Sequence, residues 1–382
     1  MEFRDLKAQY KKYKFTINRS IRNVLKEGNF IGGKEVGELE KSLADYVGVN
    51  HCITCANGTD AMTLVLDAWN VQPGDAIFVP DFTYFATVEV VSHRNAIPIF
   101  VDVLPSTFNM DPIHLEQQIH RVIQEGKLKP KVIITVDLFG LPADYPSINP
   151  IAKKYGLKVL EDSAQGFGGQ IRGQKACSFA DVATTSFFPA KPLGCYGDGG
   201  AIFTNDDHLT KIIQSLKVHG KGEDKYDNVR IGYNSRLDTI QAAVLKVKFK
   251  AFIKHELNDV QKVYQTYNSS LDGQLMVKPI IPEGYLSSFA QYTIILKDKI
   301  QRDGLQKHLK ENNIPVFVYY TKAMHQQKAL KHYQFEEKNL LNSTKLADTV
   351  LSLPMHPYMR KKDVFRISNL INKYLDTNYL SK

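Results

Sequence analysis

The chain has 382 residues, of which 43% are hydrophobic and 23% charged, values that are typical of a folded globular enzyme. Its 49 Lys and Arg residues exceed its 40 Asp and Glu residues, and the net charge of +9 favours anionic partners. The basic residues are scattered and accompany no nucleic-acid motif, which argues against a nucleic-acid partner. We expect a phosphate-bearing small molecule instead.

The first 20 residues carry charges throughout and have no apolar core, so they do not resemble a signal peptide. No apolar run elsewhere approaches the roughly 20 residues that a membrane-spanning helix needs. We therefore expect a cytoplasmic protein with no membrane partner.

Four cysteines occur, and two of them, Cys52 and Cys55, have the spacing of half a zinc site. The other two, Cys177 and Cys195, do not supply a second pair at matching spacing and have no His-rich surroundings. We therefore expect buried, reduced thiols and no metal.

From residue 50 to about residue 205, short β-rich runs alternate with helical patterns. Helices are expected near residues 59–69, 85–95 and 148–156, and strands are expected at residues 76–80, 97–102, 131–140, 157–164, 182–188 and 199–205. Several of these runs are apolar almost throughout, as in strands that are covered on both faces. The alternation predicts an α/β fold with a mostly parallel sheet, whose functional groups collect at the carboxyl ends of its strands.

The segment from about residue 207 to residue 265 is predicted to form long helices, most clearly over residues 238–271. A stretch rich in Pro, Gly and Ser follows at residues 276–288, and strands are expected at residues 289–298 and 314–321 with a helix between them. We divide the chain into an N-terminal arm (1–20), a large domain (21–255) and a smaller C-terminal α+β domain (256–382).

Two charged residues follow predicted strands. Asp162 ends an apolar strand, where it is either the N-cap of a helix or a group that binds a cationic ligand. Lys191 lies between Pro189 and Pro192, which restrict its backbone. A surface lysine is the simpler interpretation, but a lysine held in this way can be a Schiff-base nucleophile once its pKa is lowered. The glycines that follow are expected to let the chain turn tightly.

The sequence CANGTDA places small residues directly before an amphipathic helix. The N–H groups of Gly58, Thr59 and Asp60 would point out of the helix start, where a phosphate can bind, although a simple turn and cap explains the sequence equally well. A Schiff-base lysine, a carboxylate for a ring nitrogen and a phosphate site together describe a site for pyridoxal 5'-phosphate (PLP).

Seven ordered blocks resemble the sugar aminotransferases of the DegT/DnrJ/StrS type, which belong to the fold-type I PLP-dependent transferases. The blocks occupy residues 30–48, 55–62, 73–91, 136–144, 159–169, 185–206 and 230–245, and the likeness extends over essentially the whole chain. The resemblance implies a mostly parallel seven-stranded sheet flanked by helices and a smaller C-terminal domain. It also implies a homodimer with active sites at the subunit interface.

The resemblance further implies a role for several residues at the cofactor. Lys191 would bind PLP covalently and then shuttle a proton, and Asp162 would pair with the pyridine nitrogen. Gln165 would hydrogen-bond the ring hydroxyl and Tyr84 would stack on the ring. The phosphate would be held by Gly58, Thr59, Ser186 and, from the neighbouring subunit, Asn234.

The expected substrate contacts are Arg236, Tyr319 and His325. Arg236 could grip the carboxylate of the amino donor or that of a uronic acid sugar, and a surface ion pair is an equally good interpretation of it from the residues alone. Tyr319 and His325 fall where relatives line the sugar pocket. Tyr319 replaces a His of the commoner family pattern and Thr321 replaces a Pro, which leaves the identity of the sugar open.

The expected reaction is PLP-dependent transamination of a nucleotide-linked keto-sugar with L-glutamate as amino donor, for O-antigen synthesis. The blocks at residues 186–207, 234–238 and 351–358 most resemble bacterial enzymes of this family that aminate C3 of UDP-2-acetamido-2-deoxy-3-oxo-D-glucuronate, and this resemblance implies the same acceptor. The alternatives are a dTDP-3-keto-6-deoxyhexose or UDP-4-keto-sugar aminotransferase and, in another class, a non-catalytic PLP- or sugar-nucleotide-binding regulator. A dinucleotide-binding oxidoreductase would require a glycine-rich fingerprint that the sequence lacks.

Overall fold

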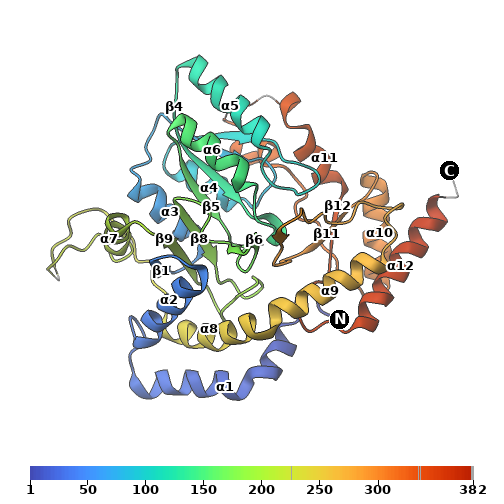
Figure 1. Ribbon diagram of the computed structural model, residues 1–382, viewed down its shortest axis with the longest axis horizontal. Helices are drawn as coiled ribbons and strands as arrows, with labels where there is room; N and C mark the ends of the chain where they lie inside the picture. Colours follow the sequence, from blue (N-terminus) through green and yellow to red (C-terminus); the bar gives the residue numbers. More distant parts are fainter. Residues whose placement is uncertain (225, 334, 336, 380–382) are drawn as a thin grey trace.

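The computed structural model describes residues 1–224, 226–333, 335 and 337–379. At its centre is a seven-stranded sheet in the order β1-β9-β8-β5-β4-β2-β3 (Figure 1). Of its described strands only β9 runs antiparallel to the others. The strands are β1 (His51–Cys55), β2 (Asp75–Pro80), β3 (Ile97–Val101), β4 (Lys129–Val136), β5 (Lys158–Asp162), β8 (Val182–Ser186) and β9 (Gly200–Thr204).

Helices cover both faces of this sheet, which explains why strands such as β2 are buried along their whole length. On one face, Ile77 and Val79 pack with residues of α3 (Gly58–Ala68), α4 (Ala86–His93) and α7 (Asp207–Leu216). On the other face, Phe78 packs with residues of α5 (Pro112–Glu125) and α6 (Tyr145–Tyr155). Alternate side chains of one strand thus enter two different cores.

The helical segment expected at residues 238–271 is nearly continuous. It consists of α8 (Thr239–Ala251), a π-helical turn η2 (Phe252–Glu256) and α9 (Leu257–Ser270). Helix α1 (Leu6–Glu27) packs along α8, and α2 (Lys34–Val47) also contacts it (Figure 1). The expected domain boundary at residue 255 falls inside η2, and it stays a prediction.

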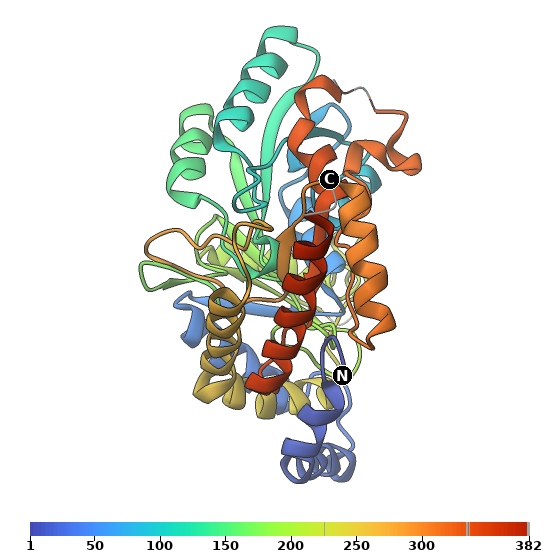
Figure 2. The same cartoon turned by 90° about the vertical axis from the view of Figure 1, so that its right-hand side faces the viewer.

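The C-terminal part is a smaller α+β unit. Strands β11 (Tyr292–Ile295) and β12 (Val350–Leu353) pair antiparallel and share one hydrophobic core with α9, α10 (Lys299–Glu311) and α12 (Lys361–Tyr379). Figure 2 shows α10 and α12 side by side on this unit. Helix α11 (Leu341–Thr349) precedes β12, and short 3-10 turns lie at η1 (Leu138–Gly140), η3 (Met324–Gln326), η4 (Lys328–Leu330) and η5 (Glu337–Asn339). A small sheet joins β10 (Tyr285–Leu286), β6 (Gln170–Ile171) and β7 (Gln174–Lys175).

The expected fold class is confirmed, whereas one expected strand is wrong. Residues 314–321 form no strand and make a single bridge, from Phe317 to Ser352. The partner of β11 is β12 instead. The 131–140 run also ends earlier than expected, because the chain enters η1 after Val136.

The four cysteines are buried and free, as the sequence predicts. Burial raises the pKa of each thiol, which keeps all four protonated and unreactive. Among the described helices, none combines the length and the apolar character that a membrane crossing requires.

Candidate active site

A cavity of about 630 Å³ opens at the carboxyl ends of the central strands. Its walls include Asn57 after β1, Tyr84 after β2, Asp162 at the end of β5 and Ser186 at the end of β8. Lys191 follows β8 and enters the same cavity. Because parallel strands place their carboxyl ends at one edge, residues far apart in sequence meet there.

The loop that carries Lys191 is a compact turn. The Lys191 N–H donates to the Phe188 carbonyl (2.9 Å), and the Cys195 N–H donates to the Phe187 carbonyl (2.7 Å). A Cβ on Gly194 would lie 2.5 Å from the Phe188 oxygen, so only glycine fits. Gly194 does not have a positive φ. The expected tight turn therefore depends on close backbone approach and not on left-handed geometry.

The Lys191 amine is held in a less charged state than a free lysine. Burial lowers its pKa, the nearby Asp162 carboxylate opposes this effect, and the positive charge of Arg4 adds to it. A lysine whose pKa is lowered has a larger unprotonated fraction near neutral pH. This is the form that acts as a nucleophile or accepts a proton.

Asp162 is buried and has two hydrogen-bond donors. Its Oδ2 accepts from Thr87 Oγ1 and its Oδ1 from the Ala164 N–H, each at 3.1 Å. Burial raises the pKa of Asp162, while these donors and the charge of Lys191 oppose the rise. A further cation in the cavity, such as a protonated ring nitrogen, would stabilise the carboxylate, so the residue fits its expected role.

The start of α3 has the features of a phosphate site. Asn57 caps the helix by accepting from the Asp60 N–H (2.8 Å). Among the described residues, none accepts a hydrogen bond from the N–H of Gly58 or of Thr59, both of which line the cavity. A Cβ on Gly58 would lie 2.9 Å from the Ser186 Cβ, so the glycine brings the helix start against Ser186. These residues fit a bound phosphate.

Gln165 and three tyrosines line the cavity toward the C-terminal unit. Gln165 Oε1 accepts from the Phe139 N–H (2.8 Å), and Gln165 Nε2 donates to the Tyr320 hydroxyl (3.1 Å). The ring centroids of Tyr84 and Tyr320 are 6.2 Å apart, and Tyr319 lies beside Tyr320. Tyr84 is 57% exposed, so its ring is open to a ligand.

Two expected residues, Asn234 and Arg236, do not line the cavity of this chain. They lie in the segment between α7 and α8, where Asn234 bridges Val218 and the Ser235 N–H donates to the Lys217 carbonyl (2.9 Å). Arg236 Nη2 donates to Asn234 Oδ1 (2.5 Å), and the intervening Ser235 donates to Asp60 Oδ2 (2.6 Å). Ser235 thus anchors the segment at the start of α3.

His325 also lies outside the cavity lining. It is buried behind β2, where its Nδ1 and its backbone N–H bond the Asp81 carboxylate at 2.6 and 2.9 Å. Burial disfavours the charged imidazole, but the hydrogen bond and the charge of Asp81 outweigh this and raise the pKa of His325. The ion pair fixes the chain just before Thr83 and Tyr84.

Several cavity residues escaped the sequence analysis, among them Tyr320, Gln291 and Ala86. Thr87, which donates to Asp162, escaped it as well. Tyr320 carried a signal, since it adjoins Tyr319 in the same aromatic run. Thr87 lies one helical turn after Thr83, with which it also shares a hydrogen bond. Gln291 Oε1 is buried and has no hydrogen-bond partner among the described residues, and the sequence gives no sign of this.

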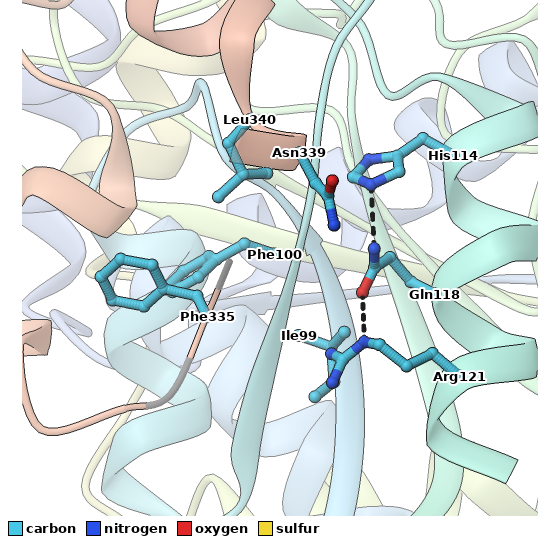
Figure 3. Close-up of a pocket in the computed structure, with 8 residues that line it drawn as sticks. All are labelled: Ile99, Phe100, His114, Gln118, Arg121, Phe335, Asn339 and Leu340. Atoms are coloured by element: carbon cyan, nitrogen blue, oxygen red, sulfur yellow. Dashed lines mark hydrogen bonds between the residues drawn. The ribbon is translucent and has the colours of Figure 1, made fainter. Parts of the chain in front are cut away.

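A second depression lies between β3, α5 and the residues Phe335, Asn339 and Leu340 (Figure 3). His114, Gln118 and Arg121 form a hydrogen-bonded row along one wall, and Phe100 and Phe335 face it. Its volume of about 10 Å³ holds at most one water molecule. The large cavity is therefore the candidate site.

Comparison with known proteins gives three findings. A sequence model of the DegT/DnrJ/EryC1/StrS aminotransferase family matches residues 12–372. The UDP-2-acetamido-2-deoxy-3-oxo-D-glucuronate aminotransferase of Pseudomonas aeruginosa is 45% identical over 94% of this chain and 96% of its own length. The crystal structure of a DegT DnrJ EryC1 StrS aminotransferase from Brucella abortus has a TM-score of 0.95 and 47% identity, and the match covers 98% of this chain and 99% of that one.

A third relative bears on the cofactor. NtdA from Bacillus subtilis, solved with the bound cofactor PMP, has a TM-score of 0.85 and 27% identity, and the match covers 96% of this chain and 82% of that one. PMP is the aminated form of PLP. The cavity described above has the carboxylate, the amine and the helix start that such a cofactor needs.

Proposed function

The chain belongs to the DegT/DnrJ/EryC1/StrS aminotransferase family and uses pyridoxal phosphate, and from this premise we propose that it aminates a UDP-linked keto-sugar with L-glutamate as donor. The proposed acceptor is UDP-2-acetamido-2-deoxy-3-oxo-D-glucuronate, aminated at C3, and the product would serve a surface polysaccharide of the O-antigen type. The support is the 45% identity to the Pseudomonas aeruginosa enzyme over nearly the whole chain. Family membership makes the chain an aminotransferase.

The residues of the cavity divide the chemistry between them. PLP supplies the electron sink that makes a substrate C–H bond acidic. Lys191 Nζ, whose lowered pKa increases its unprotonated fraction, would take the proton from the substrate carbon and return it on the cofactor side. Asp162 would hold a proton on the ring nitrogen, and Thr87 and the Ala164 N–H would hold Asp162 in place.

The phosphate and ring would be oriented by residues already rigid in the fold. Gly58, Thr59 and Ser186 would bind the phosphate at the start of α3, and Tyr84 would cover one ring face. Gln165, fixed by the Phe139 N–H and by Tyr320, would bind the ring hydroxyl. The observation that carries this proposal is that Lys191 and Asp162 meet in one cavity with the uncapped N–H groups of α3.

We further propose that two copies of the chain complete each site. Asn234 and Arg236 do not line their own cavity, and Ile231, which lies in the same segment between α7 and α8, is 94% exposed. An isoleucine this exposed suits an interface between copies. Asn234 would then reach the phosphate, and Arg236 the substrate, in the partner's cavity.

The identity of the acceptor sugar can be tested by incubating the enzyme with a panel of nucleotide keto-sugars and ¹⁵N-labelled L-glutamate. NMR of the product then locates the labelled amine. We expect ¹⁵N at C3 of the uronate sugar. Amination only of a dTDP-3-keto-6-deoxyhexose or of a UDP-4-keto-sugar would replace this assignment by that alternative. Transfer from another amino donor alone would exclude glutamate.

Arg236→Ala separates the two proposed partners of this side chain. If Arg236 binds the uronate, the variant should lose roughly 10- to 100-fold in kcat/KM on the acidic sugar and little on a neutral analogue. An equal loss on both sugars would assign Arg236 to glutamate.

A further inference from the structure

The chain segment before α1 lies between the catalytic loop and the C-terminal unit. The ring of Phe3 packs edge-on against Phe317, with 4.9 Å between centroids, and lies 6.1 Å from the ring of Tyr319. The Phe3 carbonyl accepts from the Met355 N–H (3.3 Å). Asp5 then caps α1 by accepting from the Ala8 N–H (2.8 Å). Residue 4 is therefore fixed by its neighbours on both sides.

Arg4 directs its guanidinium at the loop that carries Lys191. Its Nη2 donates to the Lys191 carbonyl (3.0 Å) and, at 3.4 Å, to the Pro192 carbonyl. Its Nη1 is buried and has no partner among the described residues. No other described side chain donates to either of these two carbonyls. Pro192 has no N–H to donate, and Arg4 supplies side-chain donors to the two carbonyls at this point of the loop.

The surroundings explain why this cation is an arginine. Burial disfavours the charge of Arg4, whereas the Glu256 carboxylate favours it. Burial lowers the pKa of two other basic groups nearby, that of Lys248 to about 8 and that of His356 to about 4, which leaves the imidazole neutral near pH 7. An arginine resists this loss of charge best, and its planar group can donate to two carbonyls at once.

We propose that Arg4 is a positioning residue for Lys191, which holds the carbonyls of Lys191 and Pro192 and so fixes where the amine meets the cofactor. The inference rests on the proposed role of Lys191. The proposal gives the start of the chain a role in catalysis. Phe3 lies beside Tyr319 in the wall of the cavity, and the neighbouring Arg4 contacts the loop that carries Lys191. Displacement of a reacting group by about 1 Å can cost 100-fold in rate, so this contact matters for activity.

The test compares Arg4→Met, Arg4→Lys and the control Lys7→Met, all as PLP-loaded protein. Lys7 is an exposed cation on α1 whose side chain is 90% accessible. Each variant is measured for kcat, for melting temperature, and for the midpoint of the pH-dependent change in the visible absorption of the bound cofactor. The Asp162 carboxylate, which faces Lys191, is the same in all of them.

Arg4→Met should lower kcat roughly tenfold or more, because the loop that carries Lys191 loses its anchor. It should also raise the pH midpoint of the absorption change by about 0.5 to 1 pH unit, because the cation that disfavours a charged Lys191 is gone. Arg4→Lys should keep the wild-type pH midpoint, because the positive charge remains. Its kcat should still be lower than that of the wild type, because an ammonium group lacks the planar guanidinium that donates to both carbonyls. Lys7→Met should match the wild type. If Arg4→Met changes only the melting temperature, the residue is merely structural and the inference is wrong.

If Arg4→Met does not fold, Arg4→Lys decides: a lower rate at the wild-type midpoint supports the inference, and unchanged values overturn it. Failure of the proposed function is separately visible. If the pH-dependent absorption persists in Lys191→Ala, the assignment of Lys191 is wrong whatever the Arg4 variants do.

Discussion

Individual charges in the site are set by their neighbours. Burial raises the pKa of Asp162 and lowers that of Lys191, so each residue is pushed toward its neutral form. Each also opposes the shift of the other, because their opposite charges attract. A cofactor with a cationic ring changes this balance by giving Asp162 a second cationic partner. Asp162 can then be ionised while Lys191 loses its proton, which is the arrangement that transamination requires.

The buried pair of His325 and Asp81 predicts a pH dependence of stability. The folded-state pKa of His325 is raised above its ordinary value of 6.5. Its contribution to the free energy of unfolding is therefore fully present below pH 6.5 and is lost as the pH rises through the folded-state pKa. Melting temperatures of wild type and Asp81→Asn between pH 5.5 and 8.5 should differ most at the acidic end. A constant difference across this range would contradict the prediction.

At the level of helices and strands, the site depends on how closely the start of α3 approaches the end of β8. Gly58 allows this approach, because a Cβ there would lie 2.9 Å from the Ser186 Cβ. Gly200 similarly lets β9 pass Asn57, whose oxygen would lie 2.4 Å from a Cβ on that residue. Gly58 and Gly200 thus allow the backbones of α3, β8 and β9 to approach one another around the proposed phosphate site.

Gly58→Ala should weaken PLP binding roughly 10- to 100-fold, because α3 must shift and its N–H groups lose the phosphate. The measurement is the PLP dissociation constant of the apoprotein by fluorescence titration. The matched control is Gly37→Ala in α2, where a Cβ would meet no heavy atom within 4 Å. The control should bind PLP normally and be slightly more stable. Equal PLP affinity in Gly58→Ala would disprove the role of this helix start.

The sequence predicted the strand ends of the site better than its far wall. Clear local sequence signals, namely apolar runs, prolines and glycines, flank Asp162, Lys191 and the start of α3. Strand β1, which contains Cys52 and Cys55, and helix α5, which follows a turn-rich segment, are not among the elements that the sequence predicts. Residues 314–321 include many β-forming residues, but Tyr319 and Tyr320 line the cavity. The strand that pairs with β11 is β12 instead. Such long-range pairing is not encoded in local propensity.

For the whole molecule, the proposed shared site makes two subunits interdependent. Lys191 and Asp162 belong to one subunit, whereas Asn234 is proposed to act in the other. Coexpressed Lys191→Ala and Asn234→Ala chains should therefore recover up to about a quarter of wild-type activity, since half of the dimers are mixed and each mixed dimer has one intact site. Lys191→Ala with Asp162→Asn should recover nothing, because both residues belong to the same subunit. Recovery in neither pair would contradict the shared site.

The central claim is that Lys191 is the residue that binds and works on the cofactor. The most direct test is borohydride reduction of the PLP-loaded protein, followed by proteolysis and peptide mass spectrometry. We predict one pyridoxyl group, on the peptide that contains Lys191, and none on the same peptide of Lys191→Ala. A label on a different lysine, or full transamination activity in Lys191→Ala, would contradict the account.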